Sequence, residues 1–429
     1  MLTDSRIKVI LSIFMSPMAL KSSSIVFING TPLADNVFQS HIISYLKILK
    51  ESGTDVSLLS ITEDSDSKSE VCESNRASIR ALLGNKAIFV KQPPANRGFN
   101  PMLKALKPAL EKIRIEKSPQ LFHTNSYLTG YLTLRILNKR RREKMLVDFK
   151  GILPQECLYY DPCNLPLRIA RYLISIKMEK YICRHADGLT VVSNAFKEWV
   201  VRKRGFAPQK IWVAPSCVDE TVFKIDWAAR EEIRKTLGWG DAPVIVYNGS
   251  LRKWQLPERM FELFTAIYKN NKDVRFLFLT DDLDGARRFM QNTATQKENF
   301  HLKSVRGANL ARYLSTGDAG ILLRKKDIVN QVASPTKFGE YLRCGLGVIA
   351  TDGIGDYSRI IREKNFGIVI PSRLDKANLE EAARWFLNHL GELRKGAEAR
   401  SYWAGAELGW AKNIQTLQQA YEALITEKP

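Results

Sequence analysis

Several features that would restrict the class of this 429-residue chain are missing. No apolar run reaches the roughly 18 to 20 residues that a membrane-spanning helix needs. The six cysteines show neither CxxC spacing nor a zinc pattern, which argues against a disulfide framework and favours a reducing, cytoplasmic compartment. A short apolar run, 9–15, follows two basic residues, but Pro17 interrupts it and no small-residue cleavage site follows. We therefore expect residues 1–23 to be an N-terminal extension rather than a signal peptide.

Acidic residues are also few, because 65 Lys and Arg face 45 Asp and Glu and give a formal charge of +20. The excess lies mainly in residues 1–210, which hold 33 basic and 18 acidic side chains. A basic half favours an anionic partner, either a membrane surface or a nucleic acid. The run Lys139–Arg142 with Lys144 lacks interleaved aromatic residues, so an exposed turn or a lipid-headgroup contact explains it better than nucleic acid. We expect a peripheral association with the cytoplasmic face of a membrane.

Short apolar runs alternate with helix-period segments from about Ser24 onward. The runs lack polar alternation, as in strands buried on both faces of a parallel sheet. They lie at 25–28, 56–60, 87–90, 120–123, 145–148, 189–192 and 210–213, and again at 243–247, 275–279, 318–323, 346–350 and 366–370. This pattern predicts an α/β fold of two tandem Rossmann-like, doubly wound domains.

We expect an N-terminal domain over 24–215, a C-terminal domain over 216–409 and a last helix over 410–429 that could cross back to the first domain. The stretch from Leu167 to Met178 is amphipathic, and basic residues at 168, 171, 177, 180 and 184 accompany its apolar face. We expect that face to pack on the sheet of the first domain, and the alternative is that the stretch rests on an anionic leaflet. Ligands of open α/β sheets bind beyond the carboxyl ends of the strands, so we place the site in the cleft between the domains.

The segment 333–345 carries the most chemical information. Ser334 suits a helix N-cap and Pro335 a first helical position, so a helix is predicted to begin there. The N–H groups and dipole of such a helix favour a diphosphate, to which Lys337 adds charge. Glu340, one turn later, suits the acceptance of hydrogen bonds from ribose hydroxyls. The alternative is a capped surface helix with a Lys–Glu pair at i, i+3.

Four segments resemble those of the family-4 glycosyltransferases of the GT-B fold, and they occur along the chain in the same order as in that family. These are the donor-loop segment 334–351, the segment 213–223 that leads into the second domain, the glycine loop 246–251 followed by Lys253, and the stretch 187–193. The resemblance implies transfer of a sugar from a nucleotide sugar, UDP- or GDP-linked, with retention of configuration. It also implies that Glu340 binds the ribose, while Lys253 and Lys337 neutralise the departing diphosphate, so that no metal or other cofactor is needed.

The resemblance assigns further donor-binding residues and has one clear departure. The expected donor contacts are Gly249, Ser250, Arg252, Ser334, Pro335, Thr336, Phe338 and Glu340. The family's first glutamate would fall at Val332, which leaves the sugar contact to other residues.

Candidate residues on the acceptor side come mainly from their positions at strand ends. Gly30 follows the first strand, His41 opens a helix, and His123 ends an apolar run. Asp148, a candidate catalytic residue, and Lys150 belong to a segment similar to an Asp-x-Arg-Gly element of related enzymes. The carboxylates at 281–284 look like a metal ligand set, but Asp favours helix starts and we interpret them as a cap.

These observations predict a glycosyltransferase that acts on a lipid-linked or membrane-proximal glycan acceptor in polysaccharide or glycolipid synthesis. Three alternatives remain. The first is a nucleotide-sugar epimerase of the same fold, and the second is a docking protein that has lost turnover. The third, nucleic-acid binding, rests on charge alone.

Overall fold

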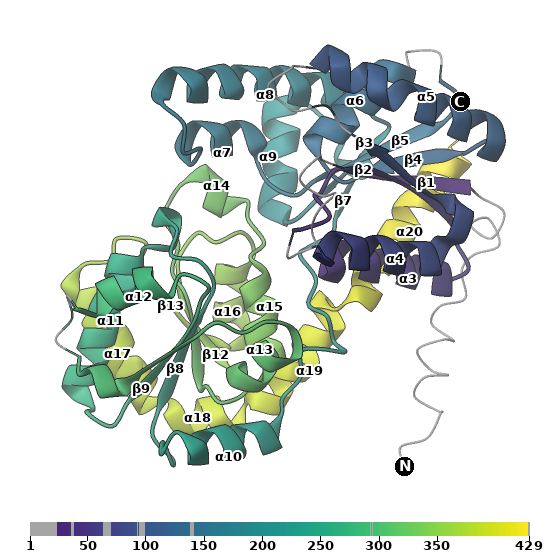
Figure 1. Cartoon of the computed structure of the whole chain (residues 1–429). Coiled ribbons are helices and arrows are strands. Elements are labelled where there is room, and N and C mark those ends of the chain that lie inside the picture. The colour runs from purple at the N-terminus through teal and green to yellow at the C-terminus, as the bar shows by residue number, and fades with distance from the viewer. Residues whose placement is uncertain are drawn as a thin grey trace. The chain divides into compact units, whose positions relative to one another are not determined.

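The computed structural model describes residues 24–35, 38–62, 70–91, 93, 99–137, 141–291, 293 and 295–427, without the side chains of residues 39–41. The chain divides into two compact units (Figure 1). The first contains residues 1–192, 197–214 and 413–429, and the second contains residues 193–196 and 215–412. Each unit is built on one parallel sheet, which is the α/β architecture that the apolar runs predicted.

The first unit has a seven-stranded parallel sheet in the order β3-β2-β1-β4-β5-β6-β7. Its strands are β1 Ser24–Asn29, β2 Asp55–Thr62, β3 Ala87–Lys91, β4 Leu121–Thr124, β5 Lys144–Phe149, β6 Gly188–Val191 and β7 Ile211–Val213. The order reverses between β1 and β4, which is the topological switch point where such sheets bind ligands.

Helices cover both faces of this sheet. Along the chain they are the π-helix Phe38–Ile43, α3 Ser44–Glu51, α4 Glu70–Leu83, α5 Phe99–Lys117, α6 Tyr127–Leu137, α7 Leu153–Tyr159, α8 Leu165–His185 and α9 Asn194–Arg204. The last helix, α20 Trp410–Thr426, belongs to this unit from Asn413 onward and lies on the same face as α3 and α4 (Figure 1). The buried side chains Ile414, Leu417, Tyr421 and Leu424 form its apolar stripe.

The second unit has a six-stranded parallel sheet in the order β10-β9-β8-β11-β12-β13. The strands are β8 Val244–Asn248, β9 Arg275–Leu279, β10 Phe300–Lys303, β11 Ala319–Leu322, β12 Gly347–Thr351 and β13 Gly367–Ile370. Its switch point lies between β8 and β11. Strand β10 was not predicted: it forms one edge of the sheet, its four residues are only partly buried, and His301 and Lys303 break the apolar run.

Two apolar clusters cover the two faces of the second sheet. One contains side chains of α11 Pro257–Asn270 and α17 Lys376–Asn388, and the other contains side chains of α13 Gly307–Leu314, α15 Thr336–Arg343, α16 Tyr357–Lys364 and α19 Ala397–Leu408. The remaining helices are α10 Trp227–Thr236, α12 Leu283–Gln291, α14 Ile328–Gln331 and α18 Leu390–Lys395. Short 3₁₀ turns lie at Gly84–Lys86, Pro208–Lys210, Lys253–Gln255 and Lys297–Asn299. Among the described helices of both units, none combines the length and the apolar character that crossing a membrane requires.

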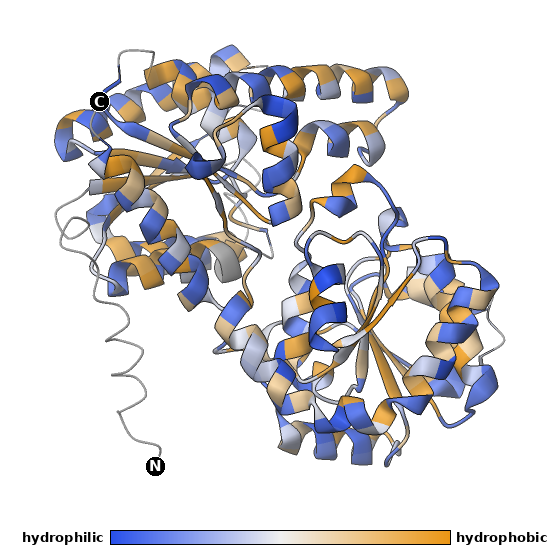
Figure 2. Cartoon of the chain, turned by 180° about the vertical axis from the view of Figure 1, so that it is seen from behind, coloured by the Kyte–Doolittle hydropathy of each residue, from blue (hydrophilic) through white to orange (hydrophobic). Residues whose placement is uncertain are grey.

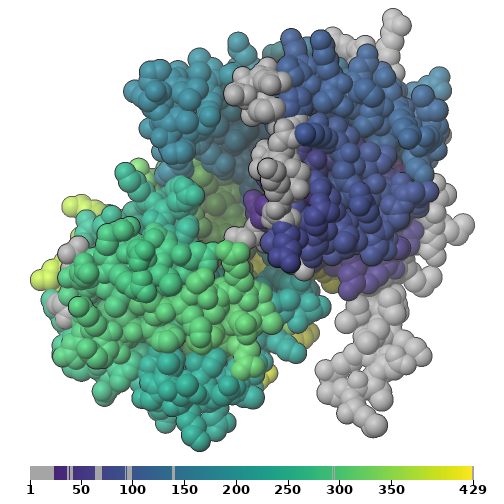
Figure 3. Space-filling model, viewed as in Figure 1, coloured from purple at the N-terminus to yellow at the C-terminus, as the bar shows by residue number. Residues whose placement is uncertain are grey.

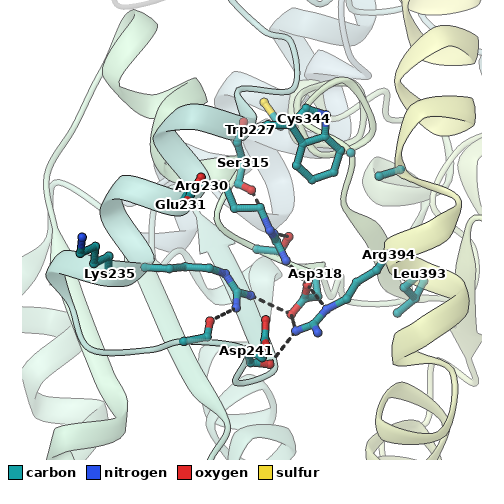
Figure 4. A pocket seen from close by; sticks show the side chains of 15 residues that line it. Trp227, Arg230, Glu231, Lys235, Asp241, Ser315, Asp318, Cys344, Leu393 and Arg394 are labelled. Atoms are coloured by element: carbon teal, nitrogen blue, oxygen red, sulfur yellow. Dashed lines mark hydrogen bonds and ion pairs between the residues drawn. The ribbon is translucent and has the colours of Figure 1, made fainter.

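The amino ends of β8 and β11 are held by a buried cluster of charges around Asp318 (Figure 4). The Asp318 carboxylate is fully buried and pairs with Arg230 at 2.6 Å, Arg234 at 3.1 Å and Arg394 at 3.0 Å. The same guanidinium groups also donate to backbone carbonyls of the loops that precede the two strands, including those of Gly317 and Ala242. Burial raises the pKa of Asp318, but the three cations outweigh that effect and hold it below its ordinary value. A cavity of about 670 Å³ opens beside this cluster, and we interpret the cluster as a structural clamp.

Replacing Asp318 by Asn should destabilise the second unit strongly, because three guanidinium groups would lose their counter-charge inside the protein. We expect the free energy of unfolding to fall by about 3–5 kcal/mol, measured by urea denaturation near neutral pH. The depressed pKa means that this stabilisation is present above the ordinary carboxyl pKa and is lost as the pH falls through the lower folded value. Asp284→Asn, which removes an 81% exposed partner of Arg287, is the control and should change stability by less than about 1 kcal/mol. Equal losses in the two variants would contradict the clamp.

Candidate donor site and its relatives

The predicted donor residues gather at the switch point of the second sheet. Asn248 ends β8, and Gly249 follows it directly. The segment after β11 returns through α14 to α15, which carries Lys337 and Glu340. Because the strands are parallel, these residues lie at the carboxyl edge of the sheet, opposite the Asp318 clamp.

Gly249 allows the two segments to approach closely. Its φ of +124° lies in a region that side-chain-bearing residues rarely adopt. A Cβ atom at this position would lie 2.8 Å from both Cε and Nζ of Lys337. Glycine is therefore required here both by the backbone conformation and by the lysine that faces it.

Lys337 is a buried amine that no carboxylate of the described residues contacts directly. Its Nζ donates to the hydroxyl of Tyr247 at 3.3 Å and to the side-chain carbonyl of Gln255, and it lies 4.3 Å from the centre of the Tyr247 ring. Burial lowers the pKa of Lys337 well below its usual value, the charge of Arg324 lowers it further, and Glu340 acts in the opposite direction. An anion placed beside Nζ would favour the charged form, so this environment suits a phosphate.

Glu340 lies one helical turn beyond Lys337, and its carboxylate accepts a hydrogen bond of 2.7 Å from the side-chain amide of Asn248. Burial raises the pKa of Glu340 to about 7, while Lys337 and the Asn248 bond lower it. Asn248 itself is held in place, because its backbone N–H donates to the Tyr341 hydroxyl at 2.9 Å. Because the pKa of Glu340 is about 7, its carboxylate changes protonation near neutral pH.

The start of α15 differs from the prediction by one residue. The helix begins at Thr336, with Pro335 as the flanking residue and no side-chain cap. Ser334 does not cap it, because its hydroxyl pairs with that of Tyr357 at 2.6 Å and accepts from the backbone of Ser216 at 3.0 Å. Phe338 is buried and stacks on the Tyr357 ring at 4.0 Å, which makes it a packing residue that holds the helix start rather than a ligand contact.

The loop after Gly249 carries the other predicted donor contacts. Ser250 accepts hydrogen bonds from Gln255 at 3.1 Å and, through its backbone carbonyl, from Tyr247 at 2.5 Å. Arg252 and Lys253 are exposed, and the Arg252 guanidinium lies 5.8 Å from the Trp254 ring. The loop therefore presents two cations to solvent beside one buried lysine.

Asn248, Gln255 and Arg324 contribute to this site but were not predicted as functional. Gln255 and Asn248 hold Lys337 and Glu340, respectively, through their side chains. Arg324 follows β11, and its charge lowers the pKa of both Lys337 and Tyr247. The run Arg324-Lys325-Lys326 directly after a predicted strand was the available signal for that residue.

The acceptor-side candidates belong to the first unit. His123 is buried in β4, and its Nδ1 bonds to the hydroxyls of Tyr45 at 3.0 Å and Tyr421 at 2.7 Å. Burial, with a smaller effect from Lys150, lowers the pKa of His123 to about 3, so its imidazole is neutral. Its Nε2 is buried and has no hydrogen-bond partner among the described residues.

Asp148 is the next-to-last residue of the neighbouring strand β5 and pairs with Lys150 at 2.5 Å. One of its carboxylate oxygens, Oδ1, is also buried without a hydrogen-bond partner in the described part of the chain. Gly30 follows β1, where a Cβ would lie 2.6 Å from a methyl group of Thr129, so tight packing explains this glycine. The side chain of His41 lies outside the described residues.

The carboxylates at 281–284 do not form one cluster. Asp282 accepts from the backbone N–H of Gly285 at 2.9 Å and so caps the start of α12, as the sequence indicated. Asp281 pairs instead with Arg306 at 2.7 Å and accepts from Ser304, while Asp284 pairs with Arg287.

Part of the chain matches a known protein family. Residues 39–222 match the model of Glycosyltransferase Family 4. No curated protein sequence matches the chain.

Solved structures match nearly the whole chain at low sequence identity. Sucrose-phosphate synthase from Thermosynechococcus elongatus superposes with a TM-score of 0.71 at 16% identity and covers 94% of this chain and 99% of its own. Anabaena HepE in complex with UDP-glucose gives 0.67 at 11% identity, with 94% and 100% covered. WaaG, a glycosyltransferase involved in lipopolysaccharide biosynthesis, gives 0.63 at 13% identity, with 94% and 100% covered. Residues 39–222 therefore match a glycosyltransferase family, and the structural matches show that nearly the whole chain has the GT-B fold.

Proposed function

We propose that this enzyme transfers a sugar from a UDP- or GDP-linked donor to a lipid-linked or membrane-proximal glycan, with retention of configuration and without a metal ion. The observation that carries the donor assignment is the contact between Gly249 and Lys337. It leaves a buried amine beside a backbone turn that only glycine fits, at the switch point where open α/β sheets bind ligands.

The diphosphate would lie at the start of α15, between Lys337 and the exposed Lys253. Backbone N–H groups and the helix dipole favour anions at this position. Negative charge grows on the diphosphate as the glycosidic bond breaks, so lysines that face it stabilise the transition state more than the ground state. These cations take the place that a divalent ion has in other nucleotide-sugar enzymes.

Glu340 would bind the ribose. As a carboxylate held by Asn248, it keeps free lone pairs for the hydroxyl groups of a sugar. A uridine donor is supported by the similar structure of HepE, which holds UDP-glucose. A membrane-proximal acceptor is supported by the basic excess in residues 1–210 and by the similarity to WaaG, which is involved in lipopolysaccharide biosynthesis.

Asp148, Lys150 and His123 are proposed for the acceptor side. Asp148 has an unpartnered buried oxygen at the carboxyl end of β5, and His123 is a neutral imidazole whose Nε2 has no partner among the described residues. We propose that Asp148 contacts a hydroxyl of the acceptor or of the transferred sugar, and that Lys150 orients the carboxylate through their ion pair.

Two other functions differ from this one in a measurable way. An epimerase would convert the nucleotide sugar into its epimer and would transfer no sugar to an acceptor. A docking protein would bind the donor without turnover. Nucleotide release with candidate UDP- and GDP-sugars, with and without membrane extracts as acceptor, separates the three. The anomeric configuration of the product, read by NMR, tests retention.

Glu340→Gln should weaken nucleotide binding, because a neutral amide is a poorer acceptor of ribose hydroxyls. We expect a loss of about 1.5–3 kcal/mol, measured by isothermal titration calorimetry with UDP and GDP. In the unmodified enzyme, affinity should fall as the pH drops below about 7, since Glu340 then takes up a proton. The variant should lack this step. Glu363→Gln, at an exposed pair with Arg359, is the control. An unchanged affinity in Glu340→Gln would remove this residue from the site.

Lys337→Ala and Lys253→Ala should lower kcat more than donor affinity, because their charges act mainly on the leaving diphosphate. Lys337→Met, which keeps much of the side-chain volume, separates the loss of charge from the loss of packing. Lys376→Ala, an exposed lysine on α17, serves as the control and should be silent. A variant with normal kcat and a raised KM would show that the lysine only binds.

Sugar transfer should continue in excess EDTA, since the lysines and the helix start supply the positive charge for the leaving group. The measurement is nucleotide release with the best donor from the screen, after dialysis against chelator and again after manganese or magnesium is added. Complete loss in EDTA with recovery in manganese would overturn the metal-independent mechanism.

A further inference from the structure

The first half of α8 exposes large apolar side chains that no described part of the chain covers. Leu165 is 58% exposed and Leu173 is 52% exposed, while Leu167, Ile169 and Ile174 range from 43% to 45%. Tyr159, at the end of α7, is 46% exposed. Six of the ten large apolar residues that the described chain exposes therefore lie on one helical hairpin. The expectation that the apolar face packs on the sheet is therefore wrong for the first half of α8.

The second half of the helix explains why the first half can stay uncovered. Ser175, Met178, Glu179 and Ile182 are buried, and α8 packs there on α6. Glu179 pairs with Arg204 at 2.5 Å and accepts from the Tyr127 hydroxyl at 2.9 Å. This anchor fixes the helix on the unit, so its exposed half does not depend on local packing.

One face of the helix changes from apolar to basic along its length. Leu165, Ile169 and Leu173 recur every four residues and share one face, and Lys177 continues the same row. Lys180 and Arg184 follow at offsets that keep them on that face, and all three basic residues are exposed. None of the three forms an ion pair within the described residues. Figure 2 shows the alternation of hydrophobic and hydrophilic residues along α8.

Arg168 and Arg171 are engaged differently from these three. Arg168 donates to the backbone carbonyl of Leu158, and Arg171 pairs with Asp161 at 2.5 Å. These contacts tie α8 to the end of α7 and to the turn that joins the two helices. These contacts hold the hairpin that carries the exposed apolar residues. The side chains of the hairpin form part of the molecular surface (Figure 3).

We propose that this hairpin surface, defined by Leu165, Ile169, Leu173, Lys177, Lys180 and Arg184, docks on an anionic lipid membrane. The apolar half enters the boundary between headgroups and acyl chains, and the basic half contacts the anionic headgroups. Charge complementarity selects this occupant, because basic side chains without an ion pair in the described chain border the apolar residues, and the first 210 residues carry a large basic excess. The proposal rests on the proposed function and extends its membrane-proximal acceptor by naming the surface that meets the membrane.

Vesicle flotation of the full chain tests the proposal, with phosphatidylcholine vesicles compared with vesicles that contain about one-third phosphatidylglycerol, an anionic lipid. The unmodified protein should float with the anionic vesicles, and its partition should fall steeply between low and physiological salt. Hydrogen exchange in residues 165–174 should slow when anionic vesicles are added. This second measurement needs no variant and holds even if a substitution impairs folding.

Two variants separate the two halves of the surface. Leu165→Ser/Ile169→Ser/Leu173→Ser and Lys177→Ala/Lys180→Ala/Arg184→Ala should each weaken partition by at least about tenfold. The charge variant should also lose most of the salt dependence, whereas the apolar variant should keep it. Val71→Ser/Ile115→Ser removes two exposed apolar residues elsewhere on the same unit and should partition like the unmodified protein. Unchanged thermal stability and nucleotide affinity certify that the variants are folded.

The outcomes are distinct. Equal partition of all variants, or equal binding to neutral and anionic vesicles, would overturn the proposal. A concentration-dependent dimer in analytical ultracentrifugation that the apolar variant abolishes, without vesicle binding, would assign the surface to a second copy of the chain. Vesicle binding without sugar transfer would contradict the proposed function but support the membrane-docking surface. Sugar transfer to a membrane acceptor without vesicle binding by α8 would do the reverse.

Discussion

The buried amine of Lys337 is the constraint on which the proposed donor site depends. An ammonium group in an apolar interior is costly unless a counter-charge is near, and here the direct partners are a hydroxyl, an amide carbonyl and an aromatic ring. The pKa of Lys337 is lowered as a result, and that of Glu340 is raised. Burial thus acts against the charged form of both groups. A diphosphate beside Lys337 would favour its ammonium form, and ribose hydroxyls that donate to Glu340 would favour its carboxylate form. A single nucleotide carries both groups, so its two parts would be recognised together.

The two ends of the second sheet differ in how their buried positive charges are paired. At the amino end, three guanidinium groups surround one buried carboxylate and donate to loop carbonyls. At the carboxyl end, Lys337 has no carboxylate at contact distance among the described residues, and Arg324 adds a second positive charge. The ion pairs of Asp318 fix the amino ends of the strands. At the carboxyl end, the positive charges of Lys337 and Arg324 favour the binding of an anion. The stabilising charge cluster and the proposed binding site therefore lie at opposite ends of the same strands.

Most of the fold could be predicted because central strands of a parallel sheet are buried on both faces and appear as unbroken apolar runs. The prediction failed for β10, since an edge strand with His301 and Lys303 lacks that signal. Local rules also failed at Ser334, where the favourable capping residue is used instead to bond Tyr357 and Ser216, both distant in sequence. The pairing of Asn248 with Glu340 spans 92 positions and depends on the switch-point topology, so no local pattern could reveal it. The periodicity of α8 shows that an apolar face exists but not what covers it, so the sequence could not decide between packing on the sheet and contact with a membrane.

Val332 bears on whether this site can turn over. It occupies the position of the glutamate that the family resemblance would place there, and its side chain is buried in the second unit. The surrounding turn is well supported, since the carbonyl of Val332 accepts from the Ser193 hydroxyl at 2.8 Å and the carbonyl of Asn330 accepts from Gly355 at 3.2 Å. The turn is thus built around a buried apolar residue and held by backbone carbonyls. The substitution therefore fits a donor whose sugar is recognised by other groups better than it fits a damaged enzyme.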